Sequence, residues 1–383
     1  MFSHRVIIPT TLISIILLVP FSPISSVFLC VLFSLFLPTV KNKYLILFIL
    51  AILSFDLAII YSAKNFHGDA SDFEIYYQFY QNILHDQSVN IVDVFFKEKS
   101  HFEPLYYITN FIISLLLGEL SEINLSILFN FISIYSIAIS VFIFSSKYTI
   151  KNLLFLVVLT LFISKIGSMT LFWRQSLSAA FIILFLSCNG FKKYIFLLVA
   201  IGFHVSSIVV APLCYLILKK KKSNVLFIVL IMFAFVWPIL GKNILLLVTH
   251  ILNPSENYFF TNNMDYPYFM DTLKTIVFSI PIVLLYRLET IKKEPEPIFY
   301  TLLLEILILI AFATTPHFFR IIYPISVAII YLHTIILMLK LKNISFVLSL
   351  FFIILINFFR LTSDELSYQF PLYSLTPFYY LYI

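Results

Sequence analysis

Long apolar runs recur along the whole chain. Most are roughly 15 to 24 residues long, and a helix needs about 20 apolar residues to cross the ~30 Å hydrocarbon core of a bilayer. The shorter runs therefore require tilt, pairing or local thinning of the bilayer. The pattern predicts an all-α, polytopic integral membrane protein with about 12 transmembrane segments, built as a single transmembrane domain over residues 1–383. The runs lie at about 6–20, 24–40, 44–62, 104–118, 122–145, 152–166, 169–188, 194–218, 223–240, 273–288, 299–313, 321–339 and 343–359.

One stretch interrupts this pattern with a long polar segment, from Ala63 to Glu103. Its seven acidic residues outweigh its three lysines, so its local charge is −4 in a chain whose net charge is +6. We expect this stretch (63–103) to be a long external loop that carries the chemistry, and residues 253–272 to form a second, shorter external loop. The acidic residues are Asp69, Asp72, Glu74, Asp86, Asp93, Glu98 and Glu103.

Lysines between the apolar runs predict the orientation, because cytoplasmic loops carry an excess of positive charge. The lysines that we place inside are Lys41, Lys43, Lys147, Lys151, Lys192 and Lys193. If Lys43 and Lys147 are both inside, only one of the two runs 104–118 and 122–145 crosses the membrane. The other is then re-entrant or lies in the interface.

Residues 194–218 stand between two lysine groups, so they must cross twice or not at all. His204 lies near their midpoint. About ten residues per crossing are too few for a lipid-exposed helix. We therefore expect a bent pair of short helices, shielded by protein, with His204 at the apex.

Composition excludes several classes of protein. The chain is 61% hydrophobic and 11% charged, with a mean hydropathy of +1.02, which excludes a soluble domain. The basic balance comes from lysines between apolar runs, so no nucleic-acid partner is implied. The three cysteines lie in apolar runs without metal-ligand spacing, which favours neither disulfides nor a zinc site. We expect the first apolar run to be a retained span rather than a signal peptide.

Arginine is scarce and unevenly placed. Arg174, Arg320 and Arg360 fall at predicted outer helix ends, where a guanidinium either contacts lipid headgroups or binds the oxygens of a phosphate. The acids of the external loop are candidates for a general base. Spacing alone does not select one of them, although Asp69, Asp72 and Tyr76 would share one face if this stretch were helical.

An ionisable side chain within an apolar run is costly to keep and is often functional. Asp56, His204 and Glu305 lie at such positions. His204 also fits a packed or hydrogen-bonded role. Asp56 and Glu305 could each act as a relay or pair with a nearby lysine or backbone amide, and the sequence leaves both interpretations open.

Five segments together resemble the EpsG-like, Wzy-type polysaccharide polymerases of bacteria, with similarity from about residue 45 to 340. They read DASDFEIYYQFY, HFEPLYYITNFIISLL, FWRQSLSAAFIILFL, GFHVSSIVVAPL and HFFRIIYPISVAIIYL. The pattern of that family falls on Asp72 and Tyr76, Glu103 and Pro104, Arg174 and Gln175, and His204 and Ser206.

The resemblance implies an enzyme that joins undecaprenyl-pyrophosphate-linked oligosaccharides at the outer face of the bacterial cytoplasmic membrane, making O-antigen, capsule or exopolysaccharide. It implies catalytic roles for Asp69, Asp72, Glu103 and His204. Substrate binding is expected at Tyr76, Arg174, Gln175, His317, Arg320 and Tyr323. No cofactor or metal is expected, since arginine supplies positive charge, and a flippase and a chain-length regulator are the expected protein partners.

Two other functions fit parts of the pattern. An acidic loop after an early span is also similar to membrane-embedded glycosyltransferases of the GT-C type, which add one sugar from a polyprenyl-phosphate donor. A lipid-linked-oligosaccharide flippase or other transporter would instead predict charges within the spans and matched halves. Here the charge is concentrated in one external loop and at outer helix ends.

Overall fold

The computed structural model describes residues 4–36, 42–63, 73–85, 103–148, 152–164, 170, 172–219, 331–341 and 370–382, together with scattered positions at 228–243 and 302–310. Within these residues the secondary structure is helical and contains no strand. The chain divides into two compact units, residues 1–205 with 347–383, and residues 206–346, and each is described by itself. The expected single transmembrane domain stays a prediction.

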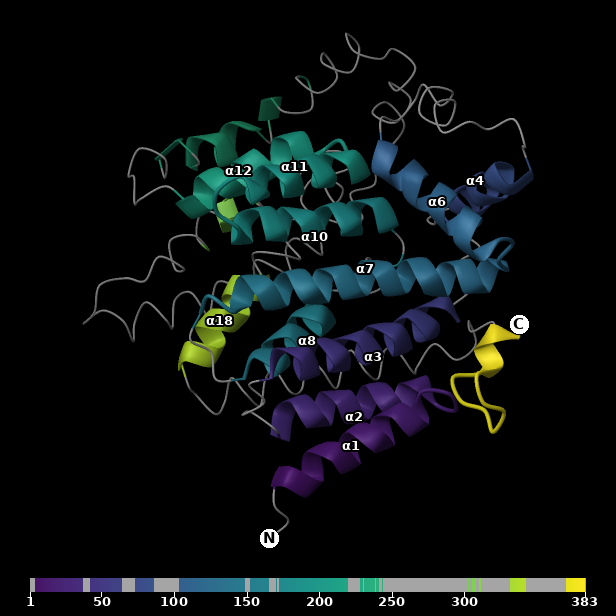
Figure 1. Ribbon diagram of the computed structural model, residues 1–383. Coiled ribbons are helices and arrows are strands. Elements are labelled where there is room, and N and C mark those ends of the chain that lie inside the picture. Colours follow the sequence, from purple (N-terminus) through teal and green to yellow (C-terminus); the bar gives the residue numbers. More distant parts are fainter. Residues whose placement is uncertain are drawn as a thin grey trace. The chain divides into compact units, whose positions relative to one another are not determined.

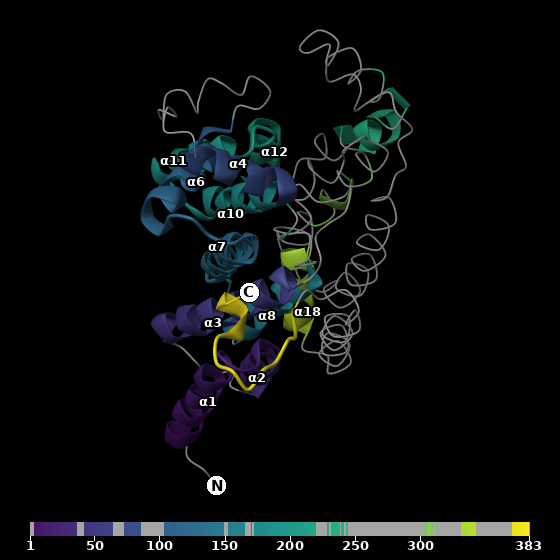
Figure 2. The ribbon, with the colours of Figure 1, turned by 90° about the vertical axis from the view of Figure 1, so that its right-hand side faces the viewer.

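The first unit is a stack of helices. Each of α1 (His4–Leu18), α2 (Pro23–Phe36), α3 (Lys43–Ser62), α7 (Glu122–Ser145) and α10 (Trp173–Ser187) contacts the next. Figures 1 and 2 show this succession from two directions. The fold therefore brings the start of α10 beside α7, and α7 beside the end of α3.

The helix boundaries follow ordinary capping chemistry. Asn42 accepts hydrogen bonds from the amides of Tyr44 and Leu45 at the start of α3, and Ser121 accepts one from Asn124 at the start of α7. Asn152 caps α8 (Leu153–Ile163) in the same way. These starts agree with the starts of the predicted apolar runs.

Among the described helices, α3 and α7 are long and apolar enough to cross a membrane, and several others are shorter apolar helices. The membrane character and the all-α class are confirmed. The count of about 12 segments depends largely on residues outside the described ranges, and so does the second external loop at 253–272.

Part of the expected external loop is a helix, α4 (Phe73–His85), which contacts α6 (Pro104–Leu117). The hydroxyl of Tyr80 donates to the carbonyl of Gly118 at the end of α6. With 14 residues, α6 is short for a span, and Leu115 and Leu116 near its end are exposed. Whether only one of the runs 104–118 and 122–145 crosses the membrane stays a prediction.

The break predicted at His204 is confirmed. Helix α11 (Lys192–Phe203) ends there, His204 itself is extended, and α12 (Ser207–Lys219) begins three residues later. In the second unit, α12 is followed by α18 (Tyr331–Leu341), with residues 302–310 partly described between them.

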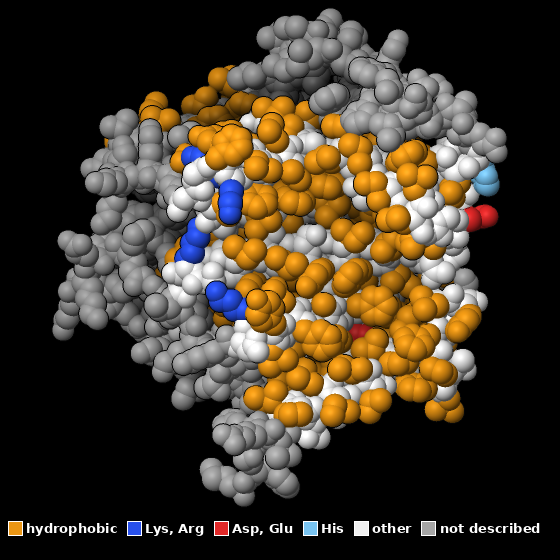
Figure 3. Space-filling view, in the orientation of Figure 1, with side chains coloured by type: hydrophobic (Ala, Val, Ile, Leu, Met, Phe, Trp, Pro, Cys, Tyr) orange, Lys and Arg blue, Asp and Glu red, His pale blue; other side chains and the backbone are white. Residues whose placement is uncertain are grey.

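Lysines gather at one end of the first unit. At this end, the Lys147 ammonium donates to the carbonyl of Leu186, which joins the last turns of α7 and α10, and Lys43 and Lys192 begin α3 and α11. Figure 3 shows lysine and arginine side chains gathered along this edge, with apolar surface beside them. Lysines beside apolar surface are typical of a boundary between membrane and water.

Residues 370–382 fold back onto the turn between α1 and α2. The amides of Ser374 and Phe378 donate to the carbonyls of Phe21 and Pro20, at 2.8 and 2.9 Å. Tyr380 is buried against Ile59 of α3. The C-terminal residues are thus packed at the end of α3 that leads into the acidic stretch.

A close approach between α6 and α11 depends on Gly202. A Cβ atom at this position would lie 2.7 Å from Cγ of Leu105, closer than two carbon atoms pack. Leu105 follows Glu103 by two residues, and Gly202 precedes His204 by two. The missing side chain of Gly202 therefore lets the regions around Glu103 and His204 approach each other.

Replacing Gly202 with Ala should lower the stability of the folded protein by about 1–3 kcal/mol, because the added methyl overpacks this contact. Thermal unfolding of the purified protein in detergent measures the loss, and Leu105→Ala in the same chain should restore part of it. Gly118→Ala is the matched control. Gly118 has open space around it but a φ of +66° and a ψ of −142°, so that change costs about 1–3 kcal/mol through its backbone, and Leu105→Ala should not reverse it.

Candidate active site

Three of the predicted site residues meet at one carboxylate in the first unit. Oε2 of Glu103 lies 2.5 Å from Nη1 of Arg174, and Oε1 lies 2.5 Å from Nδ1 of His204. The side chain of Glu103 is 3% exposed, and those of Arg174 and His204 are 15% and 12% exposed. Glu103 therefore bridges a cation and an imidazole in a mostly buried setting.

Each of the three residues stands at a helix end. Glu103 is the N-cap of α6, where Pro104 occupies the first turn and the helix dipole favours a negative charge. Arg174 is the second residue of α10, the end at which a cation is disfavoured by the dipole. Its position there is explained by the carboxylate of Glu103.

The pKa of the Glu103 carboxyl reflects two opposing effects. Burial raises it, but the hydrogen bond and charge of His204 and the charge of Arg174 outweigh burial, so the pKa lies below the usual glutamate value. Glu103 is consequently ionised at neutral pH.

Ionisation of Glu103 determines which nitrogen of His204 carries a proton. A carboxylate can only accept hydrogen bonds, so Nδ1 of His204 must donate to it. In the neutral ring, Nε2 is then the basic nitrogen. This is the arrangement by which a buried carboxylate prepares a histidine to act as a general base.

Aromatic rings hold Arg174 on its other side. Nε of Arg174 donates to the hydroxyl of Tyr76 at 3.2 Å, and its guanidinium carbon lies 5.3 Å from the ring centre of Tyr76 and 5.7 Å from that of Tyr106. These distances fit cation–π contacts. Tyr76, on α4, thus connects the acidic stretch to α10.

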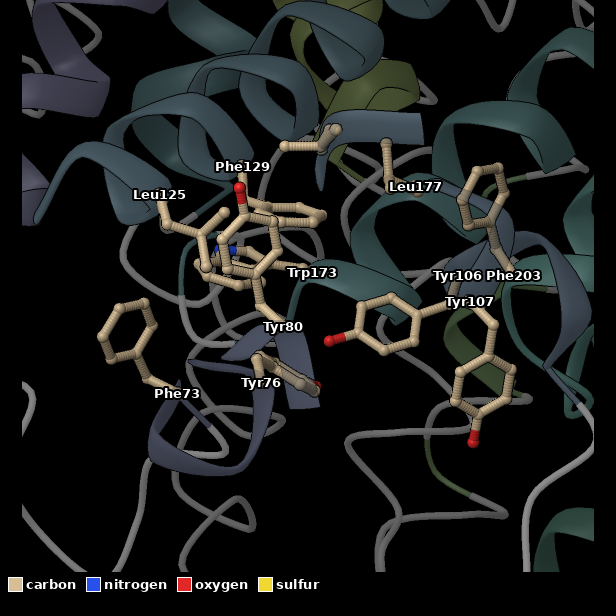
Figure 4. Close-up of a cluster of buried hydrophobic side chains, with 11 residues drawn as sticks. Phe73, Tyr76, Tyr80, Tyr106, Tyr107, Leu125, Phe129, Trp173, Leu177 and Phe203 are labelled. Atoms are coloured by element: carbon tan, nitrogen blue, oxygen red, sulfur yellow. The ribbon is translucent and has the colours of Figure 1, made fainter. Parts of the chain in front are cut away.

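Trp173 is the centre of the aromatic cluster shown in Figure 4. Its ring stacks on Phe129 at 4.4 Å and on Tyr76 at 5.0 Å, and it meets Phe73 edge to face at 5.4 Å. The cluster fixes α4 against α7 and α10, so Tyr76 is held in place by packing as well as by its hydrogen bond.

Gln175, the next residue after Arg174, is 1% exposed. Neither its amide nitrogen nor its amide oxygen has a hydrogen-bond partner among the described residues. A buried amide left this way is costly in a folded protein. Its position next to Arg174 makes it a candidate contact for a polar ligand.

The structure thus brings Tyr76, Glu103, Arg174 and His204 together, and Gln175 is the buried residue that follows Arg174 in α10. The other predicted site residues lie outside the described residues, and their roles stay predictions. They are Asp69, Asp72, His317, Arg320 and Tyr323.

Two other ionisable residues of the apolar runs, Asp56 and Glu305, are not part of the bridge at Glu103. Asp56 is buried within α3. Glu305, in the second unit, lies 3.1 Å from Nδ1 of His333, and both side chains are fully buried. The partner of Glu305 is thus a histidine and not the lysine or backbone amide considered from the sequence, and a relay role for Glu305 stays open. Among the described residues, no group of three His, Cys, Asp or Glu side chains has the arrangement of a metal site.

Sequence reasoning missed Trp173 and Asn130, which support the site. Nε1 of Trp173 donates to the amide oxygen of Asn130 at 2.7 Å. An asparagine inside the apolar run 122–145 was the available signal, since polar side chains within such runs are costly unless paired.

Comparison with known proteins agrees with the resemblance that the motifs indicated. The model of the EpsG family matches residues 48–375, which is most of the chain and includes every residue of the site described above. No curated protein and no solved structure matches the chain. The chain belongs to the EpsG family, a family of Wzy-like polysaccharide polymerases.

Proposed function

We propose that this protein joins undecaprenyl-pyrophosphate-linked oligosaccharide repeat units into O-antigen, capsule or exopolysaccharide. The observation that carries the proposal is the bridge from His204 through Glu103 to Arg174 in a chain of this family. A glycosyl transfer needs a base for the acceptor hydroxyl and positive charge near the departing pyrophosphate. In the bridge, the carboxylate of Glu103 contacts both a candidate base, His204, and a positively charged group, Arg174.

In the proposed reaction, Nε2 of His204 takes the proton of the acceptor hydroxyl. The freed oxygen forms a bond with the anomeric carbon of the donor sugar, and the bond from that carbon to the pyrophosphate oxygen breaks. Undecaprenyl pyrophosphate leaves with the bonding electrons. His204 is favoured as the base among the described residues because Glu103 holds its tautomer, while Asp69 and Asp72 stay candidates for the same role.

Positive charge for the pyrophosphate comes from Arg174 in this proposal, with Arg320 as a second candidate. A guanidinium matches phosphate oxygens with two parallel hydrogen bonds and needs no metal. The buried amide of Gln175 and the ring of Tyr76 are proposed to contact sugar or phosphate oxygens. His317 and Tyr323 are proposed to assist on the same substrate.

The proposed location is the outer face of the bacterial cytoplasmic membrane. It is supported by the lysine-bearing end formed by Lys43, Lys147 and Lys192, which suits the cytoplasmic boundary. Glu103 begins α6, next to the acidic stretch, so an outward-facing site follows if that stretch is external. A flippase would deliver the substrate there, and a chain-length regulator is a proposed partner.

Replacing Glu103 with Gln should reduce polymer formation by about 10²- to 10⁴-fold. A glutamine side chain has one acceptor oxygen, whereas Arg174 and His204 both donate to Glu103. If its NH₂ group faces His204, the histidine accepts at Nδ1 and carries its proton on Nε2. In that tautomer, Nε2 cannot take a proton from the acceptor hydroxyl. A ladder of polysaccharide chain lengths on a gel, and turnover with purified lipid-linked repeat units, measure the effect. Glu122→Gln, at the start of α7, is the control and should keep the ladder. Normal turnover in Glu103→Gln would remove Glu103 and His204 from the mechanism.

Changing Arg174 to Ala should leave the protein in the membrane but abolish long chains, so that single repeat units remain. Arg174→Lys should also fail, because one ammonium cannot bind both Glu103 and Tyr76 in the geometry of the guanidinium. Immunoblotting of membranes and the same gel give the two measurements, with Lys193→Ala on α11 as the control. A product that carries one added sugar in the wild type would instead indicate a single-sugar transferase.

A further inference from the structure

A chain of buried hydrogen bonds links α3, α7 and α10 beneath the site. The hydroxyls of Ser62 and Ser126 lie 2.9 Å apart, and the amide nitrogen of Asn130 donates to them at 2.8 and 3.3 Å. On its other side, the amide oxygen of Asn130 accepts from Nε1 of Trp173 at 2.7 Å. All four residues are 2% exposed or less.

The orientation of the Asn130 amide follows from its partners. The indole of Trp173 can only donate, so the oxygen of Asn130 must face it and the nitrogen must face the two serines. Asn130 is fully buried in α7, where an unpaired amide is costly. The network satisfies its oxygen and its nitrogen, and this leaves one favoured orientation of the side chain.

The hydrogen bond between Trp173 and Asn130 bears on the positions of Tyr76 and Arg174 as well as on that of the indole. Trp173 directly precedes Arg174 in the first turn of α10, and its indole stacks on Tyr76. The hydroxyl of Tyr76 in turn accepts from Nε of Arg174. A rotation of the indole would therefore displace the ring of Tyr76, against which the guanidinium lies.

The serine end of the network lies where the acidic stretch begins. Ser62 is the last residue of α3, and Ala63 follows it. Through Asn130, the start of this stretch is thus tied to the helix end that carries Arg174.

We propose that Asn130 is a positioning residue for the polymerase reaction, which sets the place of Arg174 through Trp173 and Tyr76. This inference rests on the proposed function. Asn130 touches none of the three residues of the bridge itself, so its effect on the reaction is exerted through the indole.

The test compares Asn130→Leu and Trp173→Phe with the wild type in turnover by purified protein. Phe keeps an aromatic ring at position 173 and removes the indole N–H, and Leu is close to Asn in size and removes both hydrogen-bonding groups. Each change should lower kcat about ten- to hundredfold with little change in KM, because a small misplacement of a positioned group has effects of that size. The double variant should be no slower than the slower single variant, since both changes break one bond.

Ser140→Ala is the matched control. Ser140 is a buried residue of the same helix whose hydroxyl donates to the carbonyl of Ser136, one turn earlier in α7. A purely structural contribution would lower the amount of folded protein and leave kcat per folded molecule unchanged, and this is the result expected for Ser140→Ala. Unchanged kcat in Trp173→Phe would overturn the inference even if Asn130→Leu does not fold.

A second measurement does not depend on activity. The chain has two tryptophans, so Trp237→Phe leaves the fluorescence of Trp173 alone. In that background, Asn130→Leu should shift the emission to shorter wavelength, because the indole loses its hydrogen-bond acceptor, and an unshifted spectrum would contradict the network. If the wild-type protein forms no polymer from lipid-linked repeat units, the proposed function fails, and if Glu103→Gln and Arg174→Ala leave polymer formation intact, the proposed site fails. If those two abolish it and Asn130→Leu and Trp173→Phe do not lower kcat, only the positioning inference fails.

Discussion

The first unit depends on one buried carboxylate that serves two partners. Arg174 occupies the wrong end of α10 for the helix dipole, and His204 interrupts the chain between α11 and α12. The ionised side chain of Glu103 makes both positions tolerable. Removing one member of such a pair leaves an uncompensated charge, typically at a cost of about 3–5 kcal/mol. Stability and the proposed chemistry therefore rest on the same interaction.

Much of the helical framework could be predicted because membrane helices follow directly from apolar length. The runs 44–62 and 122–145 became α3 and α7, and the break at His204 follows from the lysines on either side of 194–218. From the sequence alone, a helix such as α4 was only one of the structures that the acidic stretch could adopt. Its stability comes from packing of Phe73 and Tyr76 on Trp173, and such contacts between distant segments leave no periodic signal in one sequence.

For the site, the sequence supplied the residue types and the structure supplied their pairing. Spacing did not distinguish between the seven acidic residues of the acidic stretch as candidates for the general base. The family motifs pointed to Glu103 but did not indicate which residues it contacts. Its contact with Arg174 and His204 joins residues 71 and 101 positions apart. The roles of Asn130 and Trp173 depend on the angle between α7 and α10, which hydropathy does not encode.

The position of Glu103 in the chain has a consequence for biosynthesis. A ribosome makes the carboxylate before the arginine, and the imidazole last, so a neutralising group is already in the chain when Arg174 is made. Charged residues resist insertion into the bilayer by a few kcal/mol at its centre, and early pairing reduces that barrier. The order of the three residues along the chain thus suits an assembly in which α10 docks onto α6 and α7 as it emerges.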